Sequence, residues 1–242
     1  MQSILTGFHA ISERLASGSV TGTLHVSRTG SRVDELVELA KKRGIEVRTA
    51  TDSRLRRLSG RDDHRGAVLE CSETALVEET FEQCLKRLAD HPQTLVLAID
   101  GVTDPHNLGA ILRSADQFAV DVVVLPARRS AQDNETVART SAGADAYVPL
   151  VSVPNLVRAL DTLKEGGYWI FGADSSGTTA AKVDMRGRSV LVVGSEGQGL
   201  GRLVREHCDA LVAIPTKGHI DSFNVSVAAG ILLYEARRQQ WM

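Results

Sequence analysis

The chain alternates short apolar runs with longer amphipathic stretches. From Thr94 onward the runs are typical of buried strands, and the stretches between them have helical periodicity. The apolar runs read LVLAID, VDVVVLP, AYVPLV, YWIFGA, VLVVG and ALVAIP. Strands separated by helices favour a mostly parallel sheet with both faces covered, so this part is predicted to be α/β. Functional loops are then expected at the carboxyl ends of the strands.

Residues 1–73 repeat the alternation on a smaller scale. Helices are predicted over residues 7–16, 33–42 and 53–58, and strands over residues 24–27, 45–49 and 67–71. Residues 74–93 are acidic, have helical character and end near Pro92, which predicts a connector without a strand. The sequence therefore predicts a small α/β domain over 1–73, a linker over 74–93 and a larger domain over 94–242.

A glycine-rich loop follows the predicted strand over Leu191–Val193. Its glycines permit a tight turn that brings backbone amides close to a ligand; they are Gly194, Gly197, Gly199 and Gly201. Glu196 lies inside the loop, where its carboxylate either accepts hydrogen bonds from a ligand or an arginine, or caps the following helix. The spacing is neither GxGxxG nor GxxxxGK[ST], which excludes the usual nucleotide-binding loops.

A second polar loop follows the predicted strand Ala210–Ile214 and leads into the last helix. Ser222 or Asp221 is expected to cap this helix, and Asn224 lies in its first turn, facing the strand ends and the glycine-rich loop. The small residues Ala228–Gly230 predict a close approach by another segment. The expected buried stripe consists of Phe223, Val227, Gly230, Ile231 and Tyr234.

A third loop, DGVTDPHN, follows the first strand of the larger domain. Pro105 blocks continuation of a helix, and Asn107 is expected to cap the helix that follows. The expected buried stripe of that helix consists of Leu108, Ile111, Ala115 and Phe118. Arg113 is about 140° around the helix from Leu108, so it faces away from the core. It is interpreted either as a solvated side chain or as a guanidinium that faces a substrate.

The charge of the chain is nearly balanced but unevenly distributed. Lys and Arg total 28 and Asp and Glu total 30, a formal net charge of −2 that gives no overall attraction to nucleic acid. A local cluster is predicted either to contact RNA phosphates or to form a solvated helix face; the candidate RNA-binding residues are Arg54, Arg56, Arg57 and Arg65. Aromatic residues make up only 4% of the chain, which disfavours a base-stacking module.

The remaining composition narrows the class of protein. The three cysteines, Cys71, Cys84 and Cys208, have no metal-ligand spacing, so no metal is expected. No run of 18 apolar residues and no export signal occurs, so we expect a cytoplasmic protein without membrane contact.

Three segments resemble, in order, the three motifs of the TrmH family within the SPOUT superfamily of RNA methyltransferases. They read NLGAILRSA, VVGSEGQGL and IPTKGHIDSFNVSVAAGILLYEA. Residues 1–73, with GFHAISERL and HRGAVLE, resemble the L30e-like substrate-binding domain that precedes it. The segment RSAQDNETVARTSAGADAYVPLVSVPNL resembles the RlmB group, which methylates a guanosine ribose in bacterial 23S ribosomal RNA.

The resemblance implies a SPOUT domain with a C-terminal trefoil knot, an exception to the rule that chains do not thread. It implies S-adenosylmethionine as methyl donor, ribosomal RNA as partner and a homodimer formed through the SPOUT domain. Donor-binding positions carried over are Gly194, Gly199, Leu200, Ile214 and Phe223, with backbone groups of Gly194, Ile214 and Phe223 lining the adenosine.

The resemblance also implies catalytic roles. Arg113 is the proposed base, although a guanidinium is normally protonated, so orientation or phosphate binding is the physically simpler role. Asn107, Glu196 and Asn224 would position Arg113, the ribose and the donor, and Ser222 would support the loop.

Three alternatives stay open at this point. The substrate is a guanosine in transfer RNA rather than ribosomal RNA, or the protein is a non-catalytic RNA-binding assembly factor. A nucleotide-dependent enzyme of the doubly wound type comes last because its fingerprint is absent.

Overall fold

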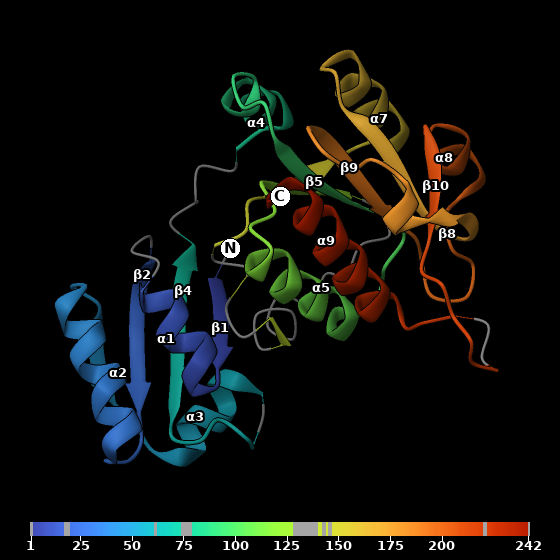
Figure 1. Ribbon diagram of the computed structural model, residues 1–242. Helices are drawn as coiled ribbons and strands as arrows, with labels where there is room; N and C mark the ends of the chain where they lie inside the picture. Colours follow the sequence, from blue (N-terminus) through green and yellow to red (C-terminus); the bar gives the residue numbers. More distant parts are fainter. Residues whose placement is uncertain are drawn as a thin grey trace. The chain divides into compact units, whose positions relative to one another are not determined.

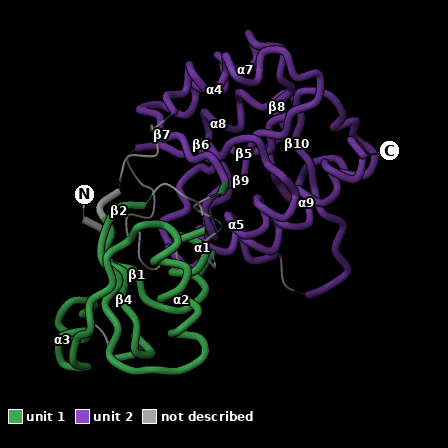
Figure 2. Tube along the Cα trace, turned by 90° about the vertical axis from the view of Figure 1, so that its left-hand side faces the viewer, with its two compact units in different colours: residues 1–77, 133–147 green, residues 78–132, 148–242 purple. Residues whose placement is uncertain are grey.

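The computed structural model describes residues 2–16, 20–60, 62–73, 79–127, 140–141, 144, 147–219 and 222–241. The chain divides into two compact units (Figures 1 and 2). The first unit comprises residues 1–77 and 133–147, and the second comprises residues 78–132 and 148–242. None of the described helices combines the length and the apolar character that crossing a membrane requires.

The first unit is an α/β layer around a four-stranded sheet of order β1-β4-β2-β3. In chain order its elements are β1 (Gln2–Thr6), α1 (Phe8–Ala16), β2 (Val20–Val26), α2 (Ser31–Lys42), β3 (Glu46–Thr49), α3 (Asp52–Ser59) and β4 (Ala67–Glu73). Strand β4 runs antiparallel to β1 and β2, whereas β2 and β3 are parallel. Strand β1 was not predicted, because the polar Thr6 is buried in it and obscures the alternation.

The second unit contains a six-stranded sheet of order β10-β8-β9-β5-β6-β7. Every pairing between its described strands is parallel, as the sequence predicts. Its strands are β5 (Thr94–Ile99), β6 (Val122–Pro126), β7 (Leu150–Val153), β8 (Trp169–Thr179), β9 (Arg188–Val193) and β10 (Ala210–Ala213). Its helices are α4 (Phe81–Leu88), α5 (Pro105–Gln117), α7 (Leu156–Glu165), the short η2 (Ala180–Lys182), α8 (Arg202–Glu206) and α9 (Val225–Trp241).

Helices α5 and α9 lie side by side on one face of this sheet (Figure 1). A Cβ at Gly230 of α9 would lie 3.4 Å from Oγ of Ser114 in α5, so the predicted close approach occurs between these two helices. Near its other end, Arg237 donates through Nε to the carbonyl of Phe118 at 2.8 Å, and Gln240 donates to the carbonyl of Gly187 at 3.2 Å. These bonds fix the end of α9 beside the amino ends of β6 and β9, so its beginning lies toward their carboxyl ends.

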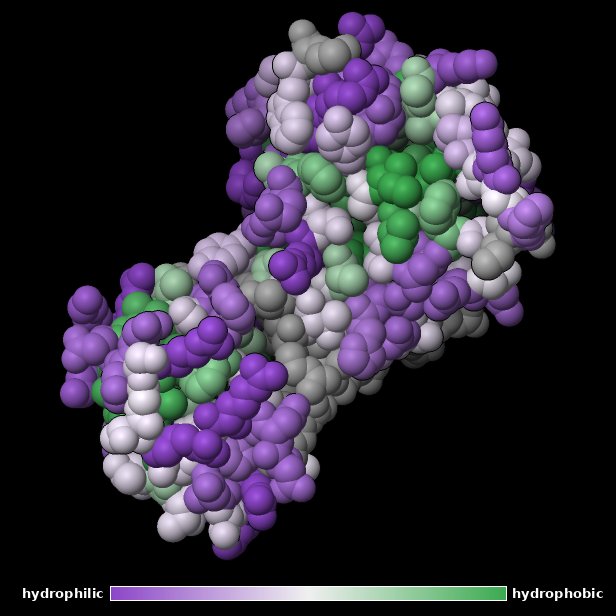
Figure 3. All heavy atoms as spheres, turned by 60° about the horizontal axis from the view of Figure 1, so that its bottom comes forward, coloured by the Kyte–Doolittle hydropathy of each residue, from purple (hydrophilic) through white to green (hydrophobic). Residues whose placement is uncertain are grey.

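The expected buried stripe of α9 was wrong. Val227, Ile231 and Tyr234 are 48%, 38% and 51% exposed, and Phe223, which precedes the helix, is also exposed. The side chains that pack on the sheet and on α5 are instead Val225, Ala229, Leu232, Leu233 and Ala236. Because α9 has two apolar faces, its periodicity does not indicate which one the chain itself covers. Figure 3 shows apolar side chains gathered on the surface of the second unit.

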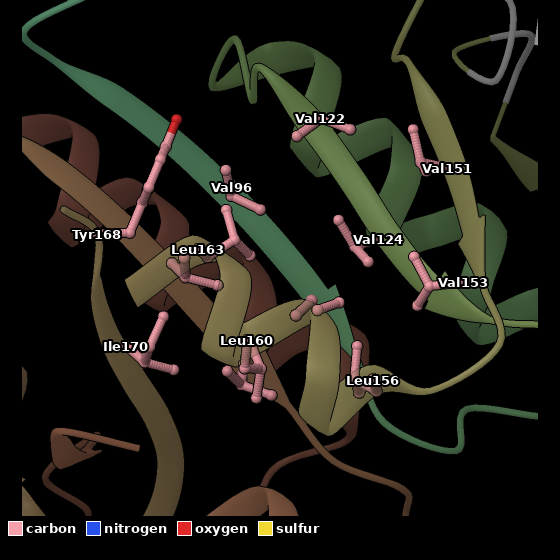
Figure 4. Close-up of a cluster of buried hydrophobic side chains, with 14 of the residues drawn as sticks. Val96, Val122, Val124, Val151, Val153, Leu156, Leu160, Leu163, Tyr168 and Ile170 are labelled. Carbon is pink, nitrogen blue, oxygen red and sulfur yellow. The ribbon is translucent and has the colours of Figure 1, made fainter. Parts of the chain in front are cut away.

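The opposite face of the sheet is covered by α4, α7 and α8. Leu160 and Leu163 of α7 pack on valines of the sheet in a buried apolar cluster (Figure 4). Cys84 and Leu88 of α4 belong to the same cluster. The segment 74–93, expected to be a linker, therefore contains a helix that contributes to the core of the second unit.

We expect Leu160→Ala to lower the free energy of unfolding by about 2–5 kcal/mol, because Leu160 is fully buried and its loss leaves a cavity. Leu203→Ala is the matched control, since Leu203 is 50% exposed, and it should cost well under about 1 kcal/mol. Urea unfolding of both variants measures the difference. Equal losses would contradict this assignment of the core.

Candidate active site

Three polar side chains from distant parts of the sequence form a hydrogen-bonded triangle in the second unit. Asn107 donates through Nδ2 to Oε2 of Glu196 at 3.1 Å. Asn224 donates through Nδ2 to Oδ1 of Asn107 at 2.9 Å and to Oε1 of Glu196 at 3.3 Å. The structure thus brings together three of the five residues that the sequence assigned to catalysis.

Asn107 can take part because another residue caps its helix. Asp104 is the N-cap of α5 and accepts from the backbone N–H groups of His106 and Asn107 at 3.1 and 3.3 Å, with Pro105 as the first helical residue. The prediction that Asn107 caps α5 was therefore wrong. Asp104 satisfies the free amides of the first turn, which leaves the Asn107 carboxamide to face the triangle.

Asn224 caps α9. Its Oδ1 accepts from the backbone N–H of Ser226 at 2.9 Å, and its carbonyl accepts from Ala228 N at 2.9 Å. The expected cap at Ser222 is therefore incorrect, and Asp221 lies outside the described residues; Ser222 is exposed two positions before the cap. A single carboxamide thus fixes the start of α9 with its oxygen and holds the triangle with its nitrogen.

The glycine-rich loop after β9 folds back on itself. Ser195 N donates to Gly199 O at 3.0 Å, and Gly199 N donates to Ser195 O at 2.9 Å. A Cβ at Gly194 would lie 2.1 Å from the carbonyl carbon of Gly199, so only glycine permits this closure. Gly197 and Gly199 adopt φ values of 84° and 65°. The tight turn predicted from the sequence is present and displays Glu196 at its tip.

Asp100, at the end of β5, ties this loop to the sheet and was given no role by the sequence. Its Oδ2 accepts from Gly201 N at 2.7 Å. Gly201 is the N-cap of α8, and no side chain makes a capping hydrogen bond to this helix. The alternative in which Glu196 caps the helix is therefore wrong. The signal that could have identified Asp100 is a carboxylate placed directly after a buried strand.

Arg113 does not join the triangle through any hydrogen bond or ion pair that the structure describes. It is exposed on α5, six residues after Asn107, as its helical position predicts. Six residues advance a helix by about 9 Å and turn it by about 240°. Arg113 is therefore displaced along and around α5 from the triangle.

The five predicted donor-binding residues occupy two loops that leave the same edge of the sheet. Gly194, Gly199 and Leu200 follow β9, whereas Ile214 and Phe223 follow β10, with β8 between the two strands. Because the strands are parallel, both loops leave at the carboxyl edge. The side chain of Leu200 packs in the core, so this residue presents only its backbone.

The cysteines do not extend this site. Burial raises the pKa of the Cys84 thiol to about 12 and that of Cys208 to about 11. Both thiols therefore stay protonated at neutral pH, which is unsuitable for a nucleophile. No group of metal-ligating side chains occurs among the residues that the structure places.

The candidate RNA-binding arginines all belong to the first unit. Arg54, Arg56 and Arg57 are exposed on α3, and Arg65 is exposed in the loop that precedes β4. Arg56 pairs through Nε with Asp62 at 2.8 Å. Arg65 is separated from the α3 group in sequence and adopts a positive φ of 51°.

Comparison with known families matches both units. Residues 94–234 match the model of the SpoU rRNA methylase family, and residues 4–76 match the model for RNA 2'-O ribose methyltransferase substrate binding. The chain belongs to the SpoU rRNA methylase family. This agrees with the three motifs, since they lie within the larger matched range.

Relatives and solved structures of this family resemble nearly the whole chain. The 23S rRNA (guanosine-2'-O-)-methyltransferase RlmB of Ralstonia nicotianae is 39% identical over 98% of this chain and 96% of its own. The protein of the same name from Xanthomonas campestris pv. campestris is 45% identical over 86% of this chain and 84% of its own. The SpoU methyltransferase AviRb of Streptomyces viridochromogenes, solved with AdoMet, is 25% identical with a TM-score of 0.81, covering 98% of this chain and 90% of its own.

We expect Gly194→Ala to destabilise the protein by about 1–3 kcal/mol, because the added methyl overlaps Gly199. Gly218→Ala is the matched control: a Cβ there meets no atom within 4 Å, so the change should be within about 0.5 kcal/mol. Chemical unfolding with hydrogen exchange at Ser195 and Gly199 measures both effects. Unaltered exchange in Gly194→Ala would show that the loop does not need the glycine.

Proposed function

We propose that this protein transfers the methyl group of S-adenosylmethionine to the ribose 2'-hydroxyl of a guanosine in bacterial 23S ribosomal RNA, in the cytoplasm. The observation that carries this proposal is the Asn107–Glu196–Asn224 triangle at the mouth of the glycine-rich loop. Two RlmB relatives, at 39% and 45% identity over most of the chain, support the choice of reaction and substrate.

The two loops at the carboxyl edge fit a donor of this kind. Gly197 and Gly199 have open space where a Cβ would lie, so a ligand can approach their backbone closely. Gly194 and Leu200 would contribute backbone groups, and Ile214 and Phe223 would flank the adenosine from the other loop. The bound donor supplies an electrophilic methyl on a sulfonium sulfur.

The triangle would align the ribose hydroxyl with the methyl group and help to remove the hydroxyl proton. A ribose hydroxyl is a poor nucleophile at neutral pH, so it must be held in line with the methyl and lose its proton. Each oxygen of Glu196 accepts one bond within the triangle and keeps further lone-pair capacity for a hydroxyl. The two carboxamides fix that carboxylate in place, and Ser222 supports the adjoining loop.

Arg113 lies about 9 Å along α5 from Asn107, so it would contact the substrate at a separate point from the triangle. Its guanidinium is a donor that stays protonated, so we assign it to orient the ribose or an adjacent phosphate rather than to accept a proton. It is exposed on α5 and points away from the core, where a substrate can reach it.

The exposed apolar face of α5 and α9 supports a homodimer formed through the second unit. Phe118 of the α5 segment stacks edge to face with Tyr234, with ring centroids 6.0 Å apart. Val227 and Ile231 extend this surface along α9. A contiguous apolar surface of this kind marks an interface in soluble proteins, and a second copy would cover it with the same residues.

The finer architecture is also part of the proposal. The C-terminal segment runs from the edge strand β10 back to α9 beside α5 and β9, which supports a trefoil knot in a SPOUT domain spanning 94–242. Residues 1–73 form an L30e-like domain that binds the RNA, supported by the substrate-binding family match. Arg54, Arg56, Arg57 and Arg65 would contribute phosphate contacts there.

A transfer-RNA substrate is the second candidate. The TrmH/SpoU tRNA modifying enzyme of A. aeolicus is 34% identical and covers 66% of this chain with a TM-score of 0.54. That similarity does not span the whole chain, whereas the RlmB relatives cover both units. A non-catalytic assembly factor is disfavoured because the triangle and the glycine-rich loop are intact.

We expect Arg113→Ala to abolish methyl transfer while the donor affinity stays within about twofold, because Arg113 faces substrate rather than the donor loops. Labelled transfer and calorimetric titration with S-adenosylmethionine measure the two quantities. Arg186→Ala is the control, since Arg186 is also exposed and pairs with Asp184 before β9. Lost donor affinity in Arg113→Ala would contradict this division of roles.

We expect Ile231→Arg to convert the dimer to a monomer, because a charge would be buried in an apolar interface. Sedimentation measures the mass of the variant beside Leu203→Arg, which places the same charge at an exposed leucine outside the α5–α9 face. A dimer in both variants would exclude the α5–α9 face as the interface.

A further inference from the structure

A cleft in the first unit gathers cationic side chains around the beginning of α2. Its volume is about 590 Å³. Three arginines line it, together with an aromatic ring and two carboxylates; these residues are Arg28, Arg32, Arg65, Phe8, Asp62 and Asp63. The three arginines are exposed, so their guanidinium groups are accessible to a ligand from solvent. The α3 arginines assigned to RNA from the sequence do not line this cleft.

The side chain of Arg28 is held in place by the backbone at Gly66. Gly66 adopts a φ of +91°, and a Cβ there would lie 2.7 Å from both Cγ and Nε of Arg28. The Arg28 side chain therefore lies along the Gly66 backbone. That backbone is fixed in turn, because Gly66 N donates to Nδ1 of the buried His64 at 3.1 Å and Gly66 O accepts from Ser27 N at 3.0 Å. Because the Arg28 side chain is already held in this position, it loses less conformational entropy when it binds a ligand.

The beginning of α2 adds backbone donors to the same cleft. Gly30 is its N-cap and supplies no side-chain acceptor, so the first amides of this twelve-residue helix are not capped by a side chain. Ser31, Arg32 and Val33, which carry these first-turn amides, line the cleft. A helix start and convergent guanidinium groups are both suited to phosphate oxygens.

Two nearby carboxylates, Asp62 and Asp52, have other partners. Asp62 is paired with Arg56, which lies outside the cleft lining. Asp52 accepts from Oγ of Ser27 at 2.5 Å, and its Oδ1 forms an ion pair with Nη2 of Arg28 at 4.0 Å. That separation is longer than a hydrogen bond, so the ion pair leaves the N–H groups of Arg28 able to donate to a phosphate.

We propose that this cleft binds a backbone phosphate of the substrate RNA through Arg28, Arg32 and the first amides of α2. Arg65 contributes charge from the facing loop, and Phe8 supplies an apolar wall for the adjoining nucleotide. The proposal rests on the proposed function, since it takes RNA as the substrate, and it deepens it by locating one phosphate contact in this cleft rather than on the α3 arginines. The cleft acts in substrate binding and takes no part in the chemical step.

The test compares two double variants of the full chain. R28Q/R32Q removes two charges from the cleft, and K41Q/K42Q removes two charges from the other end of α2. The affinity for an unmethylated 23S ribosomal RNA fragment is measured over a range of salt concentrations. Each lost phosphate contact lowers the slope of log affinity against log salt by about 0.7–0.9. Because both arginines bind the same phosphate, we expect R28Q/R32Q to lower the slope by about 0.7–0.9 and K41Q/K42Q to retain the wild-type slope.

Kinetics provide a second measurement on the same proteins. We expect R28Q/R32Q to raise KM for the RNA at least fivefold at moderate salt with kcat unchanged, because no residue of the cleft belongs to the triangle or to the donor loops. Far-ultraviolet circular dichroism and the unfolding midpoint show that both variants are folded. An unchanged slope in R28Q/R32Q, or an equal fall in K41Q/K42Q, would overturn the proposal.

The two proposals fail separately. Wild-type protein that binds the RNA fragment without methylating it would remove the proposed function, and the salt slopes of the variants would still decide whether the cleft contacts phosphate. Wild-type protein that methylates the RNA while R28Q/R32Q keeps its slope would remove the cleft alone.

Discussion

The hydrogen bonds among Asn107, Glu196 and Asn224 are the constraint on which the candidate active site depends. Asn107 is 89 residues from Glu196 and 117 residues from Asn224 in the sequence. Each of the three residues comes from a different loop at the carboxyl edge of the parallel sheet. No pair of these loops is adjacent in the chain, so their convergence requires the fold to be complete. The site is therefore a product of tertiary packing rather than of a local motif.

Two anchors allow this convergence. Asp104 and Asn224 cap α5 and α9, which sets the direction of the polar side chains at the start of each helix. At the far end of α9, Arg237 and Gln240 bind backbone carbonyls of neighbouring loops, which prevents the helix from sliding. These two bonds are partly buried, so breaking them would leave polar groups only partly able to bond water instead. The bonds of Arg237 and Gln240 at the amino edge of the sheet thus help to hold the triangle in place at the carboxyl edge.

The sequence predicts the parallel sheet and the tight glycine turn because both depend on local patterns, the apolar runs and Gly194. It fails where two choices have similar local signals. Asn107 and Asp104 are both good caps, and Pro105, which suits the first position of a helix, is the local signal that favours Asp104. The two apolar faces of α9 likewise differ only in what covers them, so Ile231 was expected inside and lies outside.

We propose that the triangle and the glycine-rich loop position a ribose hydroxyl and a methyl donor. The test is tritiated methyl transfer from S-adenosylmethionine onto unmethylated 23S ribosomal RNA and transfer RNA in parallel, followed by mapping of alkali-resistant dinucleotides. We expect label at one guanosine ribose of the 23S RNA. Label confined to transfer RNA would contradict the assigned substrate, and absence of label from both RNAs would contradict the enzymatic function itself.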